Sequence, residues 1–417
     1  MELLLTPRGT RHTMASNITD LGGATLDLSG GTYLISAPLV IPPGFGNAQI
    51  VRGTLRASAS FPSDRYLVEI GSEDCDPRLP SGAKDIQGSC GQFINLSEMM
   101  FDASHVGAGG VSVSMTMGTT IGPSVFFTGF TVAGVALNSG HECMIQQGWF
   151  CECEWSDARG SVCQEDPDAP GGNKSHSVGI LINAPDNIVT DVIIFEFTHV
   201  GVQINGAANL LQGVHAWNAG VFEGTHYEWK HGVGIAVTAH QNRIVACYLD
   251  YSALAVTDPN ELVVEASMFL GVPAVFISNA STTLQGISWH GNTFNTGGAG
   301  PNSIVVDAKF VDGEDCAVYD DVAPPGHTLQ TTRASATVAH FDAAVSEFAF
   351  TFPQLLLPHI EEVEYSFVAA SAAEPWVQHR ALKPNGTAVV VQMSAGECSF
   401  MYRYTLRESC SQFDSLP

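Results

Sequence analysis

Three stretches of sequence decide the fold: NIVTDVIIF (Asn187–Phe195), NLLQGVHAW (Asn209–Trp217) and NRIVACYLD (Asn242–Asp250). Each begins with Asn and continues with short apolar runs that alternate with polar residues. Two further runs continue the series, ELVVEASMF (Glu261–Phe269) and one that begins at Thr283. The starts at 187, 209, 242, 261 and 283 are separated by 22, 33, 19 and 22 residues. A period of about 20 residues with short β-like runs is typical of a β-solenoid.

Stacking explains why such a repeat folds. One turn cannot bury its own apolar side chains, whereas stacked turns bury them in a continuous column with strands about 4.8 Å apart. Asn187, Asn209 and Asn242 then fall at one corner of the solenoid. An Asn side chain bonds nearby backbone and tolerates left-handed geometry. We therefore expect an internal Asn ladder at this corner rather than a catalytic role.

Less regular β-like segments flank the repeat. Ala24–Pro43 has the pattern of a first, hairpin-like turn, and a loop rich in Gly, Asp and Pro spans 156–175. After Pro324 the period is lost, although β-like runs continue. We expect an atypical or truncated N-terminal segment over 1–20, a parallel β-helix over 21–324 and a β-rich C-terminal cap over 325–417. A cap is expected because an open end of a solenoid exposes strand edges.

Composition restricts the partners. The chain carries a net charge of −25, with 42 glycines and only 17 Lys and Arg residues. Few cations argue against nucleic acid, which is bound by neutralising phosphates, and against anionic membranes. The sequence has no apolar run of about 18 residues, so we expect no membrane-spanning helix. We also expect no cofactor; the sequence does not indicate the oligomeric state.

Cysteines and glycosylation sequons favour the secretory route. Short-loop disulfides could form in an oxidising compartment, although the chain shows no signal peptide, and a cytosolic protein with free thiols stays an alternative. A metal site at Cys151 and Cys153 is less favoured, because two further ligands are not evident. The residues concerned are the close cysteines Cys75 with Cys90, Cys151 and Cys153 with Cys163, and Cys398 with Cys410, and the sequon residues Asn17, Asn95, Asn173, Asn279 and Asn385.

Five long runs stand out in the sequence: GGTYLISAPLVIPP (Gly30–Pro43), GTLRASASFPSDRYLVEI (Gly53–Ile70), GHECMI (Gly140–Ile145), VGVQINGAANLLQGVHAWNAG (Val200–Gly220) and QNRIVACYLDY (Gln241–Tyr251). Together they resemble one known family, the Quartet-type polygalacturonases of the pectin-lyase-like superfamily. The resemblance implies an all-β, right-handed parallel β-helix, an extracellular setting and hydrolysis of galacturonan-type pectin. The Asp-Asp and Gly-His-Gly motifs of the better-known polygalacturonases do not occur here in order, so catalytic residues cannot be transferred by motif.

Strand alternation offers one cluster of candidate site residues. In the second and third turns His215, Trp217, Tyr248 and Asp250 should point outward, with His215 beside Tyr248 and Trp217 beside Asp250. Aromatic faces stack on sugar rings, and glycoside hydrolysis needs two carboxyl groups. Asp250 is the first catalytic candidate, His215 a group that tunes it, and Trp217 and Tyr248 substrate-binding residues. Asp191 also points outward, but two rungs and four residues separate it from Asp250, roughly 16 Å.

Other candidates come from the long 33-residue turn and from the family resemblance. Glu228 could supply the second carboxylate, while Lys230 and Arg243 could bind a uronate carboxylate and offset the acidic charge. Glu142 is a candidate substrate-binding residue through the family match alone. The ordinary alternative for the segment around Glu228 is a mobile polar loop.

The sequence therefore predicts a secreted glycoside hydrolase that cleaves a pectin-type polysaccharide by acid/base catalysis. Two alternatives stay open. One is a polysaccharide lyase on the same scaffold, which needs a basic residue and often Ca²⁺. The other is a non-catalytic, glycan-binding protein of the cell wall that keeps the fold without the site.

Overall fold

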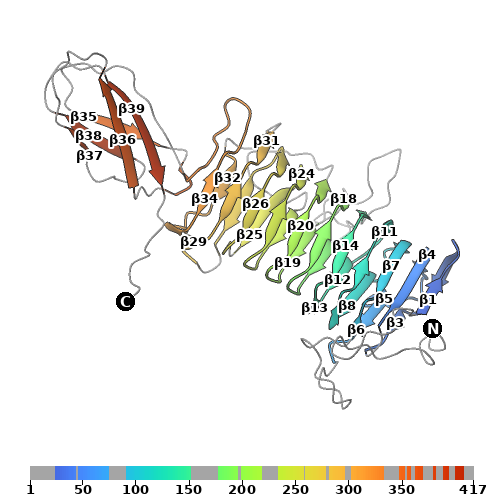
Figure 1. Cartoon of the computed structure of the whole chain (residues 1–417). Coiled ribbons are helices and arrows are strands. Elements are labelled where there is room, and N and C mark those ends of the chain that lie inside the picture. Colours follow the sequence, from blue (N-terminus) through green and yellow to red (C-terminus); the bar gives the residue numbers. More distant parts are fainter. Residues whose placement is uncertain are drawn as a thin grey trace, which may run out of the picture.

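The structure is a computed structural model of the 417-residue chain. It describes residues 24–43, 46–74, 91–151, 177–195, 199–217, 233–257, 259–278, 281–295, 302–332, 347–352, 355–357, 362–369, 379–381, 388–393 and 400–407. Within these ranges every regular element is a β-strand. Figure 1 shows the strands stacked side by side along an elongated body.

Each regular turn of this body contributes three short strands. One turn consists of β20 (Leu210–Gln212), β21 (His215–Trp217) and β22 (Val233–Val237). The next consists of β23 (Arg243–Val245), β24 (Tyr248–Asp250) and β25 (Ala253–Thr257). Every strand pairs in parallel with its counterpart in the next turn. The first two strands of each turn belong to a 19-stranded sheet and the third to a 10-stranded sheet.

The remaining strands extend both sheets and add small ones. The 19-stranded sheet also contains β1 (Ala24–Asp27), β2 (Thr32–Ile35), β4 (Ala48–Ala57), β7 (Asn95–Asp102), β10 (Thr120–Ile121), β11 (Val125–Thr128), β14 (Met144–Gln146), β15 (Gly148–Cys151), β17 (Ile188–Thr190), β18 (Ile193–Phe195), β26 (Val263–Glu265), β27 (Met268–Leu270), β30 (Ser288–His290), β31 (Thr293–Asn295) and β34 (Ala317–Tyr319). The 10-stranded sheet also contains β3 (Leu39–Ile41), β5 (Tyr66–Gly71), β8 (Gly109–Ser114), β12 (Ala133–Leu137), β16 (Val178–Ile182), β19 (Val200–Ile204), β28 (Ala274–Ile277) and β32 (Ile304–Val306). Short parallel sheets join β6 (Gly91–Gln92), β9 (Thr116–Met117) and β13 (Gly140–His141), and β29 (Thr283–Gln285) with β33 (Asp312–Glu314).

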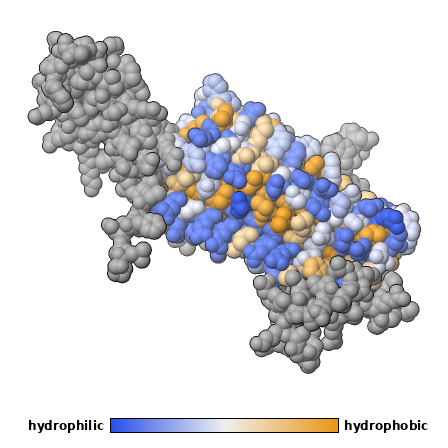
Figure 2. Space-filling model, in the orientation of Figure 1, coloured by the Kyte–Doolittle hydropathy of each residue, from blue (hydrophilic) through white to orange (hydrophobic). Residues whose placement is uncertain are grey.

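The core is a column of inward side chains between the two large sheets. Phe101, Phe127 and Phe150 occupy one register position and stack with ring centroids 4.7 and 4.6 Å apart. Farther along, Phe269 stacks on Phe294 at 4.7 Å. Rings in successive turns meet because parallel strands place identical positions one rung apart. Figure 2 shows the outer surface, where hydrophobic residues gather along the middle of the visible face between hydrophilic flanks.

Buried asparagines form the predicted ladder at one corner. The backbone N–H of Asn187 donates to Asn209 Oδ1 at 2.8 Å, and that of Asn209 donates to Asn242 Oδ1 at 2.9 Å. All three residues are at most 1% exposed. Each amide nitrogen also donates to backbone carbonyl oxygens of its own corner. The ladder satisfies backbone groups that the turn would otherwise leave buried and unpaired.

The backbone corrects two sequence-based expectations about turn boundaries. Asn242 aligns with Leu262 rather than Glu261, because Arg243 pairs with Val263. The fifth run aligns at Ile287 rather than Thr283, because Val263 pairs with Ser288. The corner residue before each turn start has a positive φ, yet it can be Ala208, Gln241 or Glu261, so no shared residue type marks it. Glu261 was therefore mistaken for the start of its turn.

The first segment is not a hairpin. β1 and β2 do not pair with each other, since both pair in parallel with β4. Their two registers place β1 beside the first half of β4 and β2 beside the second half. Ala24–Pro43 is thus an opening turn of the solenoid, whose strands lie side by side with the next turn rather than with one another.

The C-terminal strands differ in direction from the rest. β35 (Glu347–Thr351), β37 (His379–Ala381) and β38 (Ala388–Met393) form one antiparallel sheet. β36 (Glu362–Ala369) and β39 (Phe400–Arg407) form another. The predicted fold class, an all-β parallel β-helix followed by a β-rich C-terminal part, is confirmed. The predicted segment boundaries, and the role of the last segment as a cap, stay predictions.

The described cysteines lie in the body of the β-helix. Cys143, Cys151, Cys247 and Cys316 are buried, and no two described residues form a disulfide. The other cysteines of the predicted disulfides lie outside the described residues. Among the sequon residues only Asn95 is described; it begins β7, and its Oδ1 is buried without a hydrogen-bond partner.

Candidate active site

The outer face of β21 and β24 carries the predicted cluster. His215 pairs with Tyr248 and Trp217 with Asp250 across the two strands. The residues between them, Ala216 and Leu249, are fully buried. The register and the side-chain directions predicted from alternation are therefore confirmed for these turns.

His215 and Asp250 face each other diagonally across the rung. The imidazole Nε2 lies 3.9 Å from Asp250 Oδ2, with the side chains 34% and 16% exposed. His215 Nε2 and Asp250 Oδ1 are buried atoms without a hydrogen-bond partner. Unsatisfied buried polar atoms are rare in folded proteins and are often filled by a ligand or water. The pair therefore holds unsatisfied hydrogen-bonding capacity just beneath the outer face of the sheet.

Burial shifts both groups toward their neutral forms. Desolvation raises the pKa of Asp250 above its ordinary value, although the neighbouring His215 and the Tyr248 hydroxyl counteract this. Desolvation likewise lowers the pKa of His215, and Asp250 partly opposes that shift. The direction of both shifts follows from removing charged groups from water. A carboxyl group with a raised pKa beside a neutral imidazole is suited to donating a proton.

Aromatic rings border this pair. His215 and Tyr248 stack with centroids 4.5 Å apart and planes 16° from parallel. Trp217, two residues after His215, lies 6.3 Å from Phe195 on the preceding strand β18, measured between ring centroids. Phe195 in turn contacts Trp149 edge to face at 5.9 Å. Asp250 therefore lies at one end of a series of outward aromatic side chains.

The structure places three other predicted site residues away from Asp250. Asp191 is exposed at a bend before β18, and its carboxylate lies over Gly213. The strand register separates Asp191 from Asp250 by two rungs and four residues. Arg243 begins β23, and its guanidinium lies 4.0 Å from Glu265. Glu142 lies 60% exposed at the corner before β14, where its N–H donates to Asp186 O in the next turn. Glu228 and Lys230 lie outside the described residues.

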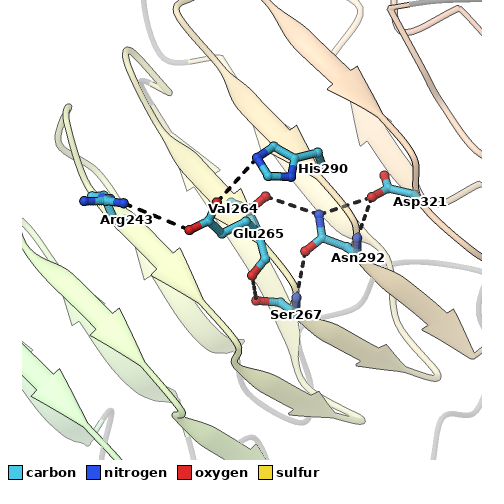
Figure 3. A network of polar contacts seen from close by, with 7 residues as sticks. All are labelled: Arg243, Val264, Glu265, Ser267, His290, Asn292 and Asp321. Carbon is cyan, nitrogen blue, oxygen red and sulfur yellow. Dashed lines mark hydrogen bonds and ion pairs between the residues drawn. The ribbon is translucent and has the colours of Figure 1, made fainter.

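A second polar cluster was not predicted from the sequence. Glu265 points outward from β26 between Arg243 and His290, whose Nε2 lies 3.4 Å from Glu265 Oε2 (Figure 3). His290 also stacks on Tyr319, with centroids 5.3 Å apart. Alternation within Glu261–Phe269 would have placed Glu265 outside, had the first strand of each turn been considered. Glu265 is paired with Arg243 on one side and with His290 on the other, so the three residues form a satisfied polar network rather than an open binding site.

Figure 3 also shows a second internal ladder beneath this cluster. The N–H of Ser267 donates to Asn292 Oδ1 at 2.9 Å, and the N–H of Asn292 donates to Asp321 Oδ1 at 2.8 Å. Trp289 Nε1 donates to the other carboxylate oxygen at 2.8 Å. Burial raises the pKa of Asp321 to about 6 despite these donors. Asp321 therefore has a structural position at the end of a ladder.

Metal-binding clusters and membrane-spanning helices are both missing from the described ranges. No group of three or more His, Cys, Asp and Glu side chains is placed to hold a metal ion in the part of the chain that the structure describes. Nor does that part contain a helix long and apolar enough to cross a membrane.

Comparison with known proteins identifies relatives. No protein-family model matches the chain. The polygalacturonase QRT3 of Arabidopsis thaliana is 32% identical over 408 residues, covering 94% of this chain and 77% of the relative. Among solved structures, the tailspike protein gp49 of Pseudomonas phage LKA1 is similar in fold, with a TM-score of 0.51 and 10% identity, covering 93% of this chain and 68% of that one. The chain belongs to the Quartet-type polygalacturonase family, as the sequence runs had indicated.

Proposed function

We propose that this protein is a glycoside hydrolase that cleaves a galacturonan-type polysaccharide at the outer face of β21 and β24. The observation that carries the proposal is the facing pair of His215 and Asp250, each with a buried polar atom that lacks a partner. The family relationship supports a glycan as the substrate. The neighbouring rings of Tyr248 and Trp217 supply apolar aromatic surface against which a sugar can pack.

In this proposal Asp250 is the proton donor. Its raised pKa increases the protonated fraction of the carboxyl group near neutral pH. Asp250 donates this proton to the glycosidic oxygen as the bond to the anomeric carbon breaks; a water molecule supplies the hydroxyl group that adds to that carbon and gives its remaining proton to a second carboxylate. His215 stays neutral, because burial lowers its pKa, and its Nε2, 3.9 Å from Asp250 Oδ2, positions and tunes the carboxyl group.

The second carboxyl group comes from elsewhere. Inverting enzymes hold the two groups about 6.5–9.5 Å apart and retaining enzymes about 5–5.5 Å. The register keeps Asp191 beyond that range, roughly 16 Å from Asp250. Glu228 is the candidate, since it belongs to the segment 218–232 that directly follows Trp217 at the end of β21. Lys230 in the same segment is the candidate for binding a uronate carboxylate.

We also propose that the protein acts outside the cell. A galacturonan is a wall polysaccharide, and the five sequons and ten cysteines of the sequence fit a secreted chain. Mass spectrometry of the protein from its native source tests this: attached N-glycans or disulfides support secretion. Unmodified sequons together with fully reduced cysteines would contradict it.

Product analysis on polygalacturonate tests the activity. The wild-type chain should generate new reducing ends without the ultraviolet absorbance of an unsaturated uronate, and a chelator should not change the rate. Unsaturated, chelator-sensitive products would instead show a lyase. Binding of the polymer without any product would show a non-catalytic wall protein. Asp64→Asn, at an exposed position outside the cluster, is the matched control for later carboxylate variants.

A further inference from the structure

An aromatic strip runs along the axis of the β-helix beside Asp250. It consists of Trp149 on β15, Phe195 on β18, Trp217 on β21 and Tyr248 on β24. These strands are consecutive partners in the same sheet, so the strip crosses three rung steps. At about 4.8 Å per step it is roughly 14 Å long.

The rings of the aromatic strip point outward and contact one another. Trp149 is 48% exposed, which is unusual for the largest apolar side chain, while Phe195 and Trp217 are half-buried. The edge-to-face contact of Trp149 with Phe195 and the contact of Phe195 with Trp217 hold the rings in a fixed series. A series of outward aromatic rings that ends in an exposed Trp is the kind of apolar surface that a ligand can cover.

The charge of the strip restricts what it can bind. The outward residues of β15, β18, β21 and β24 include no Lys or Arg and a single carboxylate, Asp250. Such a surface does not recognise an anionic group by ion pairing. It offers apolar aromatic surface, and the apolar faces of pyranose rings are its natural complement. One sugar residue in a chain advances by about the length of one rung, so successive rings match successive strands.

We propose that the aromatic strip is the track along which the polysaccharide binds, with successive sugar rings on Trp149, Phe195 and Trp217 leading to Asp250. This inference rests on the proposed function, because Asp250 marks the cleavage point. Affinity then depends on chain length, since only a polymer or a long oligomer reaches Trp149. Binding through apolar contact also makes the contribution of Trp149 insensitive to salt, unlike binding through ion pairs.

Calorimetric binding on the full chain carrying Asp250→Asn tests the track without consuming the ligand. The probes are polygalacturonate and digalacturonate, each at low and high salt. Adding Trp149→Ala should raise Kd for the polymer by about ten-fold, equally at both salt concentrations, and leave Kd for digalacturonate unchanged. Trp149→Phe should retain most of the affinity, because it keeps a ring at the same position.

Tyr33→Ala is the matched control, since Tyr33 is 45% exposed but lies on β2 in the opening turn, away from the strip. Thermal unfolding of each variant shows that a change in binding is not a loss of fold. An unchanged Kd in Trp149→Ala, an equal loss for both probes, or no binding of either probe overturns the track. Trp149-dependent binding by a wild-type chain that releases no product would retain the track and refute the hydrolase.

Discussion

Two outward aspartates on the same register position of the β-helix differ in almost every respect except their place in the fold. Asp102 lies on β7 and Asp250 on β24, and the pairing of successive strands connects them through five rung steps. Asp102 accepts hydrogen bonds from Arg56 Nε at 2.6 Å and from the N–H and hydroxyl of Ser104 at 2.8 and 3.0 Å. Asp250 has a buried oxygen without a partner.

The contrast between the two aspartates teaches that side-chain direction and chemical role are set by different parts of the sequence. Alternation along the strand turns both carboxylates outward. The neighbours in the adjacent rungs determine the chemical environment: Arg56 is the register partner of Asp102, whereas Leu270 and Trp217 are those of Asp250. A cation makes the first aspartate structural. Apolar register partners leave the second desolvated, with one carboxylate oxygen that lacks a hydrogen-bond partner.

Replacing each carboxylate with an amide should give the largest contrast, in activity. Asp250→Asn removes the proposed proton donor, so kcat/KM on polygalacturonate should fall about a hundred-fold or more. Asp102→Asn and the surface control Asp64→Asn should stay near wild type. Initial rates of reducing-end formation measure the difference. Comparable rates in Asp250→Asn and wild type would remove Asp250 from the catalytic machinery.

Stability should show the reverse order. Asp102→Asn weakens the contact with the half-exposed Arg56 and the hydrogen bond from the N–H of Ser104. The free energy of unfolding should therefore fall by about 1–2 kcal/mol. Asp250→Asn removes a desolvated charge and should leave stability within about 0.5 kcal/mol or raise it. Denaturant titration of both variants checks this. A larger loss in Asp250→Asn would mean that this aspartate is structural as well.

A third aspartate sharpens the comparison, since Asp321 has partners that are all neutral donors. Its folded pKa of about 6 exceeds the ordinary value of 3.8, so the folded state binds a proton more tightly than the unfolded state. Stability should therefore fall as pH rises from about 4 to about 6, by an amount on the order of 2 kcal/mol, and then level off.

Asp321→Asn should flatten this dependence, whereas Asp102→Asn should not. Chemical denaturation at several pH values measures it in each variant. An unchanged slope between about pH 4 and pH 6 in Asp321→Asn would assign the effect to other groups.

The smallest expected effect tests whether the residue in the next strand is what distinguishes the environment of Asp250 from that of Asp102. Leu270→Arg places a guanidinium beside Asp250 in the position that Arg56 has beside Asp102. The cation should lower the pKa of Asp250, and the alkaline limb of the pH profile should move to lower pH, because a general acid is lost as pH rises through its pKa. The rate at neutral pH should fall about ten-fold. Leu270→Gln controls for lost packing, and an unmoved limb in Leu270→Arg would contradict the proposed role of Asp250.

Much of the fold could be predicted from the sequence because it depends on local alternation. Val214, Ala216, Cys247 and Leu249 point inward as expected, since a period of two needs no knowledge of distant residues. Turn boundaries were harder. The residue at the corner adopts a positive φ whether it is Ala208 or Glu261, so composition gives no marker for it.

The candidate site was predictable only in part, because only strands that could be aligned from the sequence revealed their neighbours. The proximity of His215 and Tyr248 followed from aligning two repeats that both begin with Asn. Glu265 and His290 were missed because only the second strand of each turn was examined for outward residues. The partner of Asp102 was missed because Arg56 lies on β4, in the turn after the opening one, which lacks the Asn repeat. The role of Glu228 stays a prediction.

The corners of the β-helix have a consequence for how such proteins diversify. The chain leaves the 19-stranded sheet after Cys151, Trp217 and Asn295, and in each case the strand that comes next resumes parallel pairing with a neighbouring turn. The parallel pairing of the stack is thus kept across sequence segments of very different length at this edge, which in other turns is closed by single positive-φ residues such as Tyr251 and Gly271. That edge adjoins the position of Asp250. A lineage can therefore exchange the segments beside its reaction centre while inheriting an unchanged scaffold, and an engineer can graft new ones there.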